Sequence, residues 1–590
     1  MFIKTNIFKA ISFRNPVKLP FSYWVLVCLR FVFTIIPQRG YIHPDENMFV
    51  PKMILGPPLH LIRLMNPYSR YYLGIDLKTP YYLLVIPRLY ICLLSLINDY
   101  CLYRICLLYG QNFRNRLKIF ASSYVVLVYC CRSFSNSFEM IFFSILLLLV
   151  AECMLKSDKI IYHDEFLREK YQQATTAVER VKLFKLRTHL PAHSLNHVIV
   201  IATVVVVGFK DFHLRIFMLI TCTIPTVILL ILVDSTYYGY LMIAEIETLK
   251  ISWNNWVVTP LNFLRYNSNM KNLTQHGLHP RWLHLAVNVP LLFNILGLDF
   301  VFSHYRFIRG QYSKLPRIQS ITGLMLFSLV IPVAVLSVFP HQEARFIIPI
   351  LMPLVYLYGN HLHVNETDGP KFRKLRNVLL YSWYFLNLIL TIFFGFIHQG
   401  GIYPFANDLH YEIKSIYGAH THVITTHSYS VPTFLLQLES TNKIWRDKKT
   451  GHPYRLAPTT FIHKYGSLPM NDLFAKVDEV LTNAEMLLHK HNKQYRFYIA
   501  SPCSLERDIQ ITASKYNYFN LIEEYSYYPH FCTEAIPKFP DSRDQLCVEN
   551  TLRHNESLVI DLNMLQRISC FFKRFCFRIY KVNAKSKVRL

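Results

Sequence analysis

The chain has 590 residues, of which 52% are hydrophobic, 15% aromatic and 17% charged. Soluble domains average about 25% charged residues, so this composition excludes a disordered chain and argues against an ordinary soluble enzyme. The formal net charge of +26 comes from basic residues between long apolar runs, which favours the cytosolic loops of a membrane protein over a nucleic-acid-binding surface. We therefore predict a polytopic all-α membrane protein.

A helix that spans a bilayer needs about 20 mainly apolar residues. The candidate runs are, in chain order, 21–37, 80–98, 117–131, 138–154, 197–233, 282–303, 318–339, 346–360 and 377–397. The first run follows a basic leader and ends without a small-residue cleavage site, so it is predicted to be a signal anchor with residues 1–20 in the cytosol. Residues 21–397 are predicted to form the multi-span domain.

Basic segments set the predicted orientation, because Lys and Arg concentrate in cytosolic loops. The basic segments are 99–118, 155–196, 304–317 and 371–376, which leaves 38–79, 132–137, 234–281, 340–345 and the chain after 398 on the lumenal side. Residues 197–233 must then cross an odd number of times, and we expect one crossing plus a re-entrant piece around Gly208–His213. The sequons at Asn272 and Asn555 are predicted to be glycosylated and the one at Asn365 to stay unused.

Residues 38–79 form the first predicted lumenal loop. Its segments Pro51–Gly56 and Leu59–Met65 are amphipathic and flank Pro57-Pro58, a pattern typical of two short helices lying flat on a membrane. At its start, His43-Pro-Asp-Glu46 places two carboxylates just after a span. These carboxylates are either solvated loop residues, or one of them is a general base that accepts a proton from a sugar hydroxyl. Spacing alone leaves both interpretations open.

The second polar cluster, Pro340-His-Gln-Glu-Ala-Arg-Phe346, lies between two apolar runs. One interpretation is an exposed Arg–Glu pair that contributes little. The other is phosphate recognition, in which the planar fork of Arg345 binds phosphate oxygens and His341 adds a second donor. Asp234, at the end of another run, is likewise either a solvated helix end or a residue that orients an acceptor.

Residues 398–590 are less apolar and are predicted to form a lumenal C-terminal region with a smaller α/β appendage. It contains Cys503, Cys532 and Cys547, so one disulfide is expected on an oxidising side of the membrane. Residues 569–580 alternate aromatic and basic side chains, and we expect them at the membrane interface. The late histidines match no metal-binding spacing, so no metal is predicted.

Together these motifs resemble the dolichyl-phosphate-mannose-dependent mannosyltransferases of the endoplasmic reticulum, which have the GT-C fold. That family carries an acidic motif in its first lumenal loop and an H-x-E-x-R-F motif, matched here by His43–Glu46 and His341–Phe346. The resemblance covers residues 20–435. It is strongest to the branch that adds the fourth mannose of the glycosylphosphatidylinositol (GPI) core, on Tyr41–Glu46, Arg132–Ser137, Asp234–Gly239, Thr259–Asn267, His276–Arg281 and His398–Gly401.

The resemblance implies a GT-C-type helical domain with amphipathic loop helices and a lumenal active site in the endoplasmic reticulum membrane. It implies an inverting α-1,2-mannosyltransferase that uses dolichyl-phosphate-mannose as donor and the third mannose of the GPI precursor as acceptor. Asp45 would be the base, with Glu46 as the alternative, and Arg345 and His341 would bind the donor phosphate. Substrate-positioning roles fall to His43, Asp234, Tyr237, Asn262, Arg265, His279 and Glu343. No cofactor is implied, and we expect a monomer that contacts membrane lipid and no nucleic acid.

Three alternatives remain at this point. A sister mannosyltransferase, acting on the third GPI mannose or the N-glycan precursor, would share both motifs. A lipid transporter or scramblase would carry charges inside its spans and repeated halves, whereas few charges lie inside the runs and no repeat is seen. A scaffold subunit without activity would tolerate mutation of Asp45.

Overall fold

The computed structural model describes most of the chain. The described residues are 19–40, 42, 52–188, 224–225, 227–236, 240–241, 252, 256–258, 261–262, 265–266, 269, 278–310, 316–317, 320–364, 369–415, 419–438, 444–446, 453–455, 459–516, 519–541, 547 and 563–584. The predicted re-entrant piece near Gly208–His213 and the three sequons lie outside the described residues.

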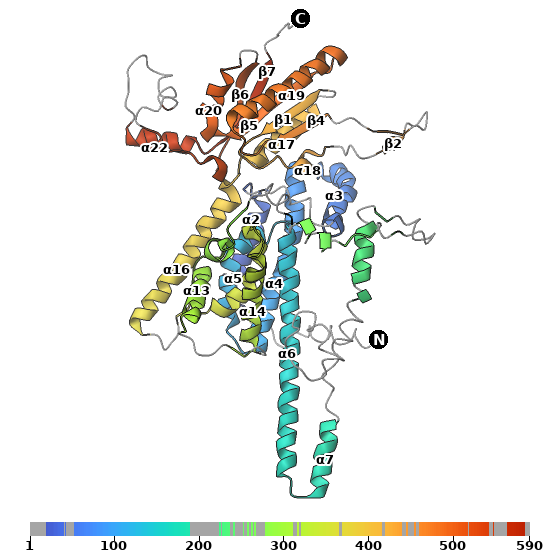
Figure 1. The fold of residues 1–590 in the computed structure, drawn as a ribbon, viewed down its shortest axis with the longest axis vertical. Coiled ribbons are helices and arrows are strands. Elements are labelled where there is room, and N and C mark those ends of the chain that lie inside the picture. The colour runs from blue at the N-terminus through green and yellow to red at the C-terminus, as the bar shows by residue number, and fades with distance from the viewer. Residues whose placement is uncertain are drawn as a thin grey trace. The chain divides into compact units, whose positions relative to one another are not determined.

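Helices make up most of the chain up to residue 415 (Figure 1). They are α2 (Phe21–Ile35), α3 (Lys52–Leu73), α4 (Pro80–Leu108), α5 (Phe113–Ser122), the π-helix η2 (Val125–Tyr129), α6 (Ser135–Gln173), α7 (Ala177–Thr188), the π-helix η4 (His284–Asn288), α13 (Val289–Ile308), α14 (Ile321–Leu336), the 3-10 helix η5 (Ala344–Ile350), α15 (Leu351–Tyr358), α16 (Pro370–Ile392), the π-helix η6 (Phe393–Ile397) and α17 (Ile402–Ser415).

The described helices confirm the predicted apolar runs in their position along the chain, except for 197–233, most of which lies outside the described residues. Among the described residues, four helical stretches are long and apolar enough to cross a membrane, namely Pro80–Leu108, Ser135–Gln173, His284–Ile308 and Pro370–Ile397. Shorter apolar helices cover Phe21–Ile35, Val227–Thr236, Ile321–Leu336 and Ala344–Tyr358. The predicted run 117–131 is split between α5 and η2, because the chain leaves the helical conformation at Ser123. The protein is therefore a polytopic, mainly helical membrane protein.

One predicted boundary is wrong. Helix α3 runs through Pro57-Pro58, where two separate short helices were predicted. Each proline removes one hydrogen bond from the helix, and the 15 residues that follow in α3 continue the helix past that loss. Helix α6 has 39 residues and continues beyond the predicted run 138–154, and α7 begins at Ala177, shortly after α6 ends at Gln173. The basic segment 155–196 is therefore largely helical.

Several polar side chains of the helical region form hydrogen bonds, which an apolar surrounding favours. Asn112 caps α5 by accepting from the backbone N–H groups of Arg114 and Asn115. Arg116, 6% exposed, donates from Nε to the Tyr356 carbonyl of α15 over 2.8 Å. Trp383 of α16 is fully buried and donates to the Ser122 hydroxyl over 2.9 Å. These bonds connect α5 to α15 and α16.

The chain divides into two compact units. The first comprises Met1–Cys28, Leu93–Val126 and Asn136–Leu386, and the second comprises Leu29–Cys92, Leu127–Ser135 and Asn387–Leu590. The second unit therefore contains both residues 29–92, which include the end of the first apolar helix, and the C-terminal appendage. The predicted regions 1–20, 21–397 and 398–590 were divided by their expected position relative to the membrane. The two compact units do not test this division, so it stays a prediction.

The predicted α/β appendage is confirmed as a five-stranded mixed sheet in the order β4-β1-β5-β7-β6. The strands are β1 (His420–Thr425), β4 (Thr460–Lys464), β5 (Tyr495–Pro502), β6 (Phe519–Tyr527) and β7 (Phe577–Ala584). β1 pairs in parallel with β4 and β5, and β7 pairs antiparallel with β5 and β6. A separate hairpin joins β2 (Ile444–Arg446) and β3 (Pro453–Arg455).

Helices cover both faces of the sheet. One face, with Val423, Tyr498 and Phe577, packs on α17 and α18 (Thr433–Leu436), and Ile42 and Ile62 join that core. The other face, with Ile424 and Tyr580, packs on α19 (Met470–His491) and α20 (Glu506–Ala513). Helix α22 (Met564–Lys573) and the short 3-10 helices η7 (Cys503–Leu505) and η8 (Thr533–Ala535) complete the appendage.

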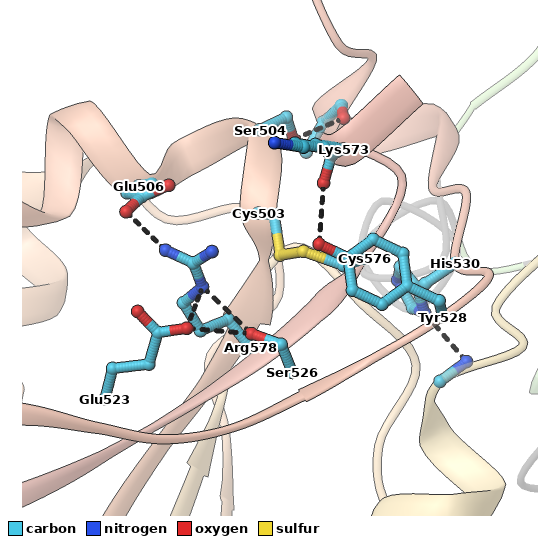
Figure 2. The surroundings of a disulfide bond; sticks show 12 residues. Cys503, Ser504, Glu506, Glu523, Ser526, Tyr528, His530, Lys573, Cys576 and Arg578 are labelled. Carbon is cyan, nitrogen blue, oxygen red and sulfur yellow. Dashed lines mark hydrogen bonds and ion pairs between the residues drawn. A yellow bond between two sulfur atoms is a disulfide. The ribbon is translucent and has the colours of Figure 1, made fainter. Parts of the chain in front are cut away.

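Two disulfides form in the appendage, where one was expected. They join Cys503 to Cys576 and Cys547 to Cys570, while Cys532 is a buried free thiol. Figure 2 shows the Cys503–Cys576 bridge between the end of β5 and the start of β7.

The interfacial position expected for residues 569–580 is wrong for their C-terminal part. Strand β7 is flanked by β5 and β6, and Phe577 and Tyr580 are buried on opposite faces of the sheet. The alternation of aromatic and basic residues is strand periodicity, because successive side chains of a strand point to opposite faces. Arg578 is held inside the appendage by ion pairs with Glu506 and Glu523 (Figure 2).

Candidate active site

The turn between α14 and η5 brings His341, Glu343 and Arg345 into one network within the first unit. His341 Nε2 lies 3.0 Å from Glu343 Oε1, and Arg345 Nε forms an ion pair with Glu343 Oε2. The exposed fractions of the three side chains are 12%, 29% and 11%. A single carboxylate thus holds an imidazole and a guanidinium close together. The interpretation of an exposed ion pair does not apply, since both donors are largely shielded.

Gln342, between these residues, fixes the turn from the opposite side. Its amide is 2% exposed and donates to the carbonyls of Arg281 (3.2 Å) and Phe339 (3.1 Å), and its Oε1 accepts from the His284 backbone N–H (3.0 Å). The His279 N–H also donates to the Pro340 carbonyl over 2.8 Å. Two segments far apart in sequence, 279–284 and 339–345, are therefore joined.

Two rings, those of His279 and Phe346, lie close to this network. The His279 and His341 ring centroids are 6.3 Å apart, and the Arg345 guanidinium lies 5.7 Å from the centre of the Phe346 ring. A guanidinium and an imidazole held at one carboxylate can together bind an anion with tetrahedral oxygens, such as a phosphate. The geometry therefore suits recognition of a phosphorylated substrate.

A second polar centre, in the second unit, holds the start of the first predicted loop. The Arg132 guanidinium is 0% exposed and donates from Nη2 to the Gly40 carbonyl over 2.7 Å. Gln38 donates to the Leu127 carbonyl over 2.9 Å, and the Arg88 guanidinium donates to the Gln38 carbonyl over 2.8 Å. Buried hydrogen bonds to a guanidinium are among the stronger ones in proteins. They fix the chain directly before the acidic pair.

Gly40 is required at this position. Its N–H donates to the Gly395 carbonyl over 2.8 Å, so the chain lies directly against η6. A Cβ at Gly40 would lie 2.6 Å from the Phe394 carbonyl oxygen and 2.8 Å from the Phe396 nitrogen, both backbone atoms that cannot rotate away. Two residues further on, Ile42 is fully buried in the core of the second unit. These contacts therefore fix the loop backbone as far as residue 42.

The motif His398-Gln-Gly-Gly401 forms the joint between η6 and the appendage. The Gln399 N–H donates to the Phe531 carbonyl (2.9 Å), and the Phe531 N–H donates to the Ile397 carbonyl (3.0 Å). The Gln399 side chain contacts the Cys532 thiol (3.1 Å) and accepts from the Tyr429 N–H (3.3 Å). The segment Tyr528–Glu534 forms the appendage side of this joint.

Two buried histidines line this joint. His530 accepts from the Gly401 N–H at Nδ1 over 3.2 Å and stacks on Phe577 with 4.7 Å between centroids. Burial lowers the pKa of His530 to about 3, and burial together with the nearby Arg132 charge lowers the pKa of His398 to about 4. Both imidazoles are therefore neutral near pH 7, so the joint consists of neutral hydrogen bonds and stacked rings.

The predicted site residues fall into three groups. His341, Glu343, Arg345 and His279 are brought together as described. Asp234 lies in the helix Val227–Thr236, and Asn262 and Arg265 are exposed in short helical stretches of the same unit. His43, Asp45, Glu46, Tyr237, Asn272 and Asn555 lie outside the described residues.

Three residues that build these sites were not predicted as site residues. Gln342, Arg132 and Ser235 were named only as parts of longer motifs, and no role was predicted for them. The Ser235 hydroxyl is buried, accepts from the Val257 N–H over 2.8 Å and donates to the Ile231 carbonyl over 2.6 Å. All three lie in short polar segments at the ends of apolar runs, so the sequence does not separate them from their neighbours; their burial, which requires hydrogen-bond partners, is seen only in the structure.

Comparison with known families decides what kind of enzyme carries these sites. The profile of the Alg9-like mannosyltransferase family matches residues 50–436. The chain belongs to this family. This Alg9-like mannosyltransferase is accordingly a membrane-embedded glycosyltransferase, and the resemblance noted in the sequence is confirmed at the family level.

Individual relatives of this Alg9-like mannosyltransferase are similar along most of their length. A Drosophila melanogaster protein named GPI mannosyltransferase 4 is 35% identical over 605 residues, which cover 88% of this chain and 86% of the relative. A human protein named GPI alpha-1,2-mannosyltransferase 4 is 28% identical, covering 70% of this chain and 75% of its own. A Debaryomyces hansenii protein named GPI mannosyltransferase 4 is 29% identical, covering 70% and 79%.

Proposed function

We propose that this chain is an α-1,2-mannosyltransferase of GPI-anchor biosynthesis. It transfers mannose from dolichyl-phosphate-mannose to the third mannose of the GPI precursor in the endoplasmic reticulum membrane, with the active site on the lumenal side. The observation that carries the proposal is the 35% identity to a relative named GPI mannosyltransferase 4 over 88% of this chain. Since 88% of the chain is covered, the similarity also extends beyond residue 436, where the family profile ends.

The proposed reaction is a single displacement at the anomeric carbon. Asp45 accepts the proton of the acceptor 2-hydroxyl, and the freed oxygen attacks the mannosyl carbon while the bond from that carbon to the phosphate oxygen breaks. The electron pair leaves with dolichyl phosphate, so a β-linked donor gives an α-linked product. Glu46 is the alternative base or positions Asp45. The hydrogen bonds of Gly40 and Arg132 support this role, because they fix the backbone five residues before Asp45.

The leaving phosphate gains negative charge in this step, and we assign its stabilisation to Arg345 and His341. Both side chains are shielded from solvent and held by Glu343, so little reorganisation is needed when charge develops. Glu343 has a positioning role, because it keeps the guanidinium and imidazole oriented before the donor binds. No metal or cofactor is required, since the two basic groups can neutralise a monophosphate.

The proposed function is tested in cells that lack this chain, by analysis of their GPI precursors. We expect a three-mannose precursor to accumulate and the four-mannose product to return when the intact chain is supplied. The Asp45→Asn variant is expected to insert normally and to restore no product, because an amide cannot accept the proton. Accumulation of a two-mannose precursor would contradict the acceptor assignment, and rescue by Asp45→Asn would contradict the base assignment.

A further inference from the structure

Helix α22 carries an apolar face that the described residues of the appendage leave exposed. Its exposed apolar side chains are Met564 (59% exposed), Leu565 (77%) and Phe572 (63%), and none of its residues is buried. The helix is nevertheless well formed, because Asn563 and Gln566 make a reciprocal capping box at its start. A stable helix with an exposed apolar face is typical of a surface that binds something.

The neighbouring segment 536–541 extends this face. Ile536 and Phe539 are 62% and 43% exposed. Phe539 packs against Phe571 with 5.5 Å between ring centroids, and Arg567 stacks over Phe539 at 4.9 Å and donates to the Pro540 carbonyl over 2.8 Å. We call the exposed side chains of Ile536, Phe539, Met564, Leu565 and Phe572 the α22 surface.

Aromatic contacts connect α22 to the end of a membrane span. Phe571 contacts Phe575 (5.1 Å between centroids), Phe575 stacks on Phe531 (5.9 Å), and Phe531 contacts Phe393 of η6 (5.3 Å). The span Pro370–Ile397 ends only four residues after Phe393. Because a span ends at the membrane interface, these contacts bring the C-terminal end of α22 close to that level.

Covalent bonds hold α22 in this place. One bridge joins Cys570 of the helix to Cys547, and the other joins Cys576, three residues beyond the end of the helix, to Cys503. The His530 N–H donates to the Phe575 carbonyl over 2.9 Å, and the Tyr528 hydroxyl donates to the Lys573 carbonyl over 3.1 Å (Figure 2). The α22 surface is therefore a fixed part of the second unit.

Basic residues border the α22 surface. The two segments carry one acidic residue, Asp541, and four basic residues, Lys538, Arg567, Lys573 and Arg574. Of these, Lys538 and Lys573 are exposed. An apolar face bordered by cations fits the boundary of a phospholipid bilayer, where acyl chains meet anionic headgroups.

We propose that the α22 surface binds the bilayer in which this chain is embedded. Met564, Leu565 and Phe572 enter the headgroup–acyl boundary on the side where Pro370–Ile397 ends, and the basic residues contact anionic headgroups. The appendage is thereby attached to the membrane at a second place besides the His398–Gly401 joint. This inference does not depend on the proposed reaction.

The test is lipid quenching in the full-length protein. The chain is reconstituted into nanodiscs of phosphatidylcholine with 20–30% phosphatidylglycerol, with or without bromine on the upper acyl carbons. Met564→Trp adds a fluorophore to the α22 surface, and Met486→Trp is the matched control, since Met486 is 47% exposed in α19. We expect brominated lipid to quench most of the emission added by Met564→Trp and little of that added by Met486→Trp.

Equal quenching of the two added tryptophans would overturn the proposal. So would emission of Met564→Trp that is shifted to the blue but changes only with protein concentration, because that result would indicate a second copy of the chain on the α22 surface. A further variant, Lys573→Glu, tests the charge component. It is expected to reduce the quenching of Met564→Trp in phosphatidylglycerol-containing discs and to have less effect in pure phosphatidylcholine. An unchanged signal in both lipids would remove anionic headgroups from the proposal.

Discussion

Glu343 shows how one carboxylate can prepare a binding site. It contacts His341 and Arg345 at the same time, so both donors are already oriented before any substrate is present. Gln342 holds the backbone of the same turn through three carbonyl acceptors. Preorganised donors are more effective than mobile ones, since they do not have to be ordered when the substrate binds.

Arg345→Lys is expected to reduce donor use roughly tenfold, equivalent to about 1.4 kcal/mol, although the charge is kept. Lysine has one donor nitrogen in place of the planar fork, so it cannot keep the contact with Glu343 and also offer phosphate a bidentate contact from separate nitrogens. The measurement is kcat/KM for dolichyl-phosphate-mannose with the purified chain. Arg104→Lys is the control, because Arg104 pairs with Glu152 elsewhere in the first unit at 3.4 Å. Equal activity of the two variants would contradict the role of Arg345.

His422 makes the appendage sensitive to acid. It is 8% exposed, stacks between Phe461 and Phe497 and lies 3.3 Å from His463. Burial, reinforced by the neighbouring histidine charges, lowers the pKa of His422 to about 4. The unfolded chain binds the proton more readily, so the stability that this neutral ring contributes is present above pH 6.5 and is lost as the pH falls towards 4.

His422→Phe should therefore flatten the pH dependence of appendage stability. Phenylalanine keeps the stacking and cannot be protonated, so up to about 2 kcal/mol of destabilisation at pH 5 is removed. The check is the unfolding temperature of the full chain between pH 7.5 and pH 5. His489→Phe, at an exposed position of α19, is the control. A parallel decrease in both variants would show that His422 is not responsible.

Among the elements, η6 and the glycines after it leave almost no room for larger side chains. The backbone of η6 contacts Gly40 on one side, and Gln399 bonds to Phe531 of the appendage on the other. A Cβ at Gly400 would lie 2.2 Å from the Phe396 carbonyl oxygen and 2.5 Å from the Pro529 carbonyl oxygen. Glycine is needed here because two backbone segments meet without room for a side chain.

Gly400→Ala is expected to destabilise this joint by about 1–3 kcal/mol, the usual cost of overpacking. The measurement is thermal unfolding of the full chain, combined with limited proteolysis of the appendage. Gly369→Ala serves as the control, because no atom lies within 4 Å of its added Cβ. If both alanine variants unfold at the parental temperature, the close approach seen at Gly400 is not a constraint.

For the molecule as a whole, the basic segments set an orientation that can be tested. The segment 371–376 opens α16 and carries four basic residues, so the chain before it is expected to be cytosolic. The sequon at Asn365 should therefore stay unmodified even when its loop is lengthened, whereas Asn555 should be glycosylated. Enzymatic deglycosylation and gel mobility of single-sequon variants provide the measurement. Modification at Asn365 would reverse the predicted orientation.

The sequence by itself determined the membrane helices, the mixed appendage and the family. Apolar runs of about 20 residues form spanning helices whatever their neighbours are, because the bilayer leaves the backbone no other partner. The turn His341–Phe346 could also be predicted from the sequence, since its residues contact others only a few positions away.

Only the tertiary structure decided which distant segments meet. Arg132 reaches Gly40 across 92 positions, Cys503 pairs with Cys576 across 73, and residues 577–584 become a strand that β5 and β6 flank. Periodicity reports whether a segment has an apolar face, but not which surface covers it. The choice between bilayer and sheet for residues 577–580 therefore depended on the long-range packing that buries Phe577 and Tyr580.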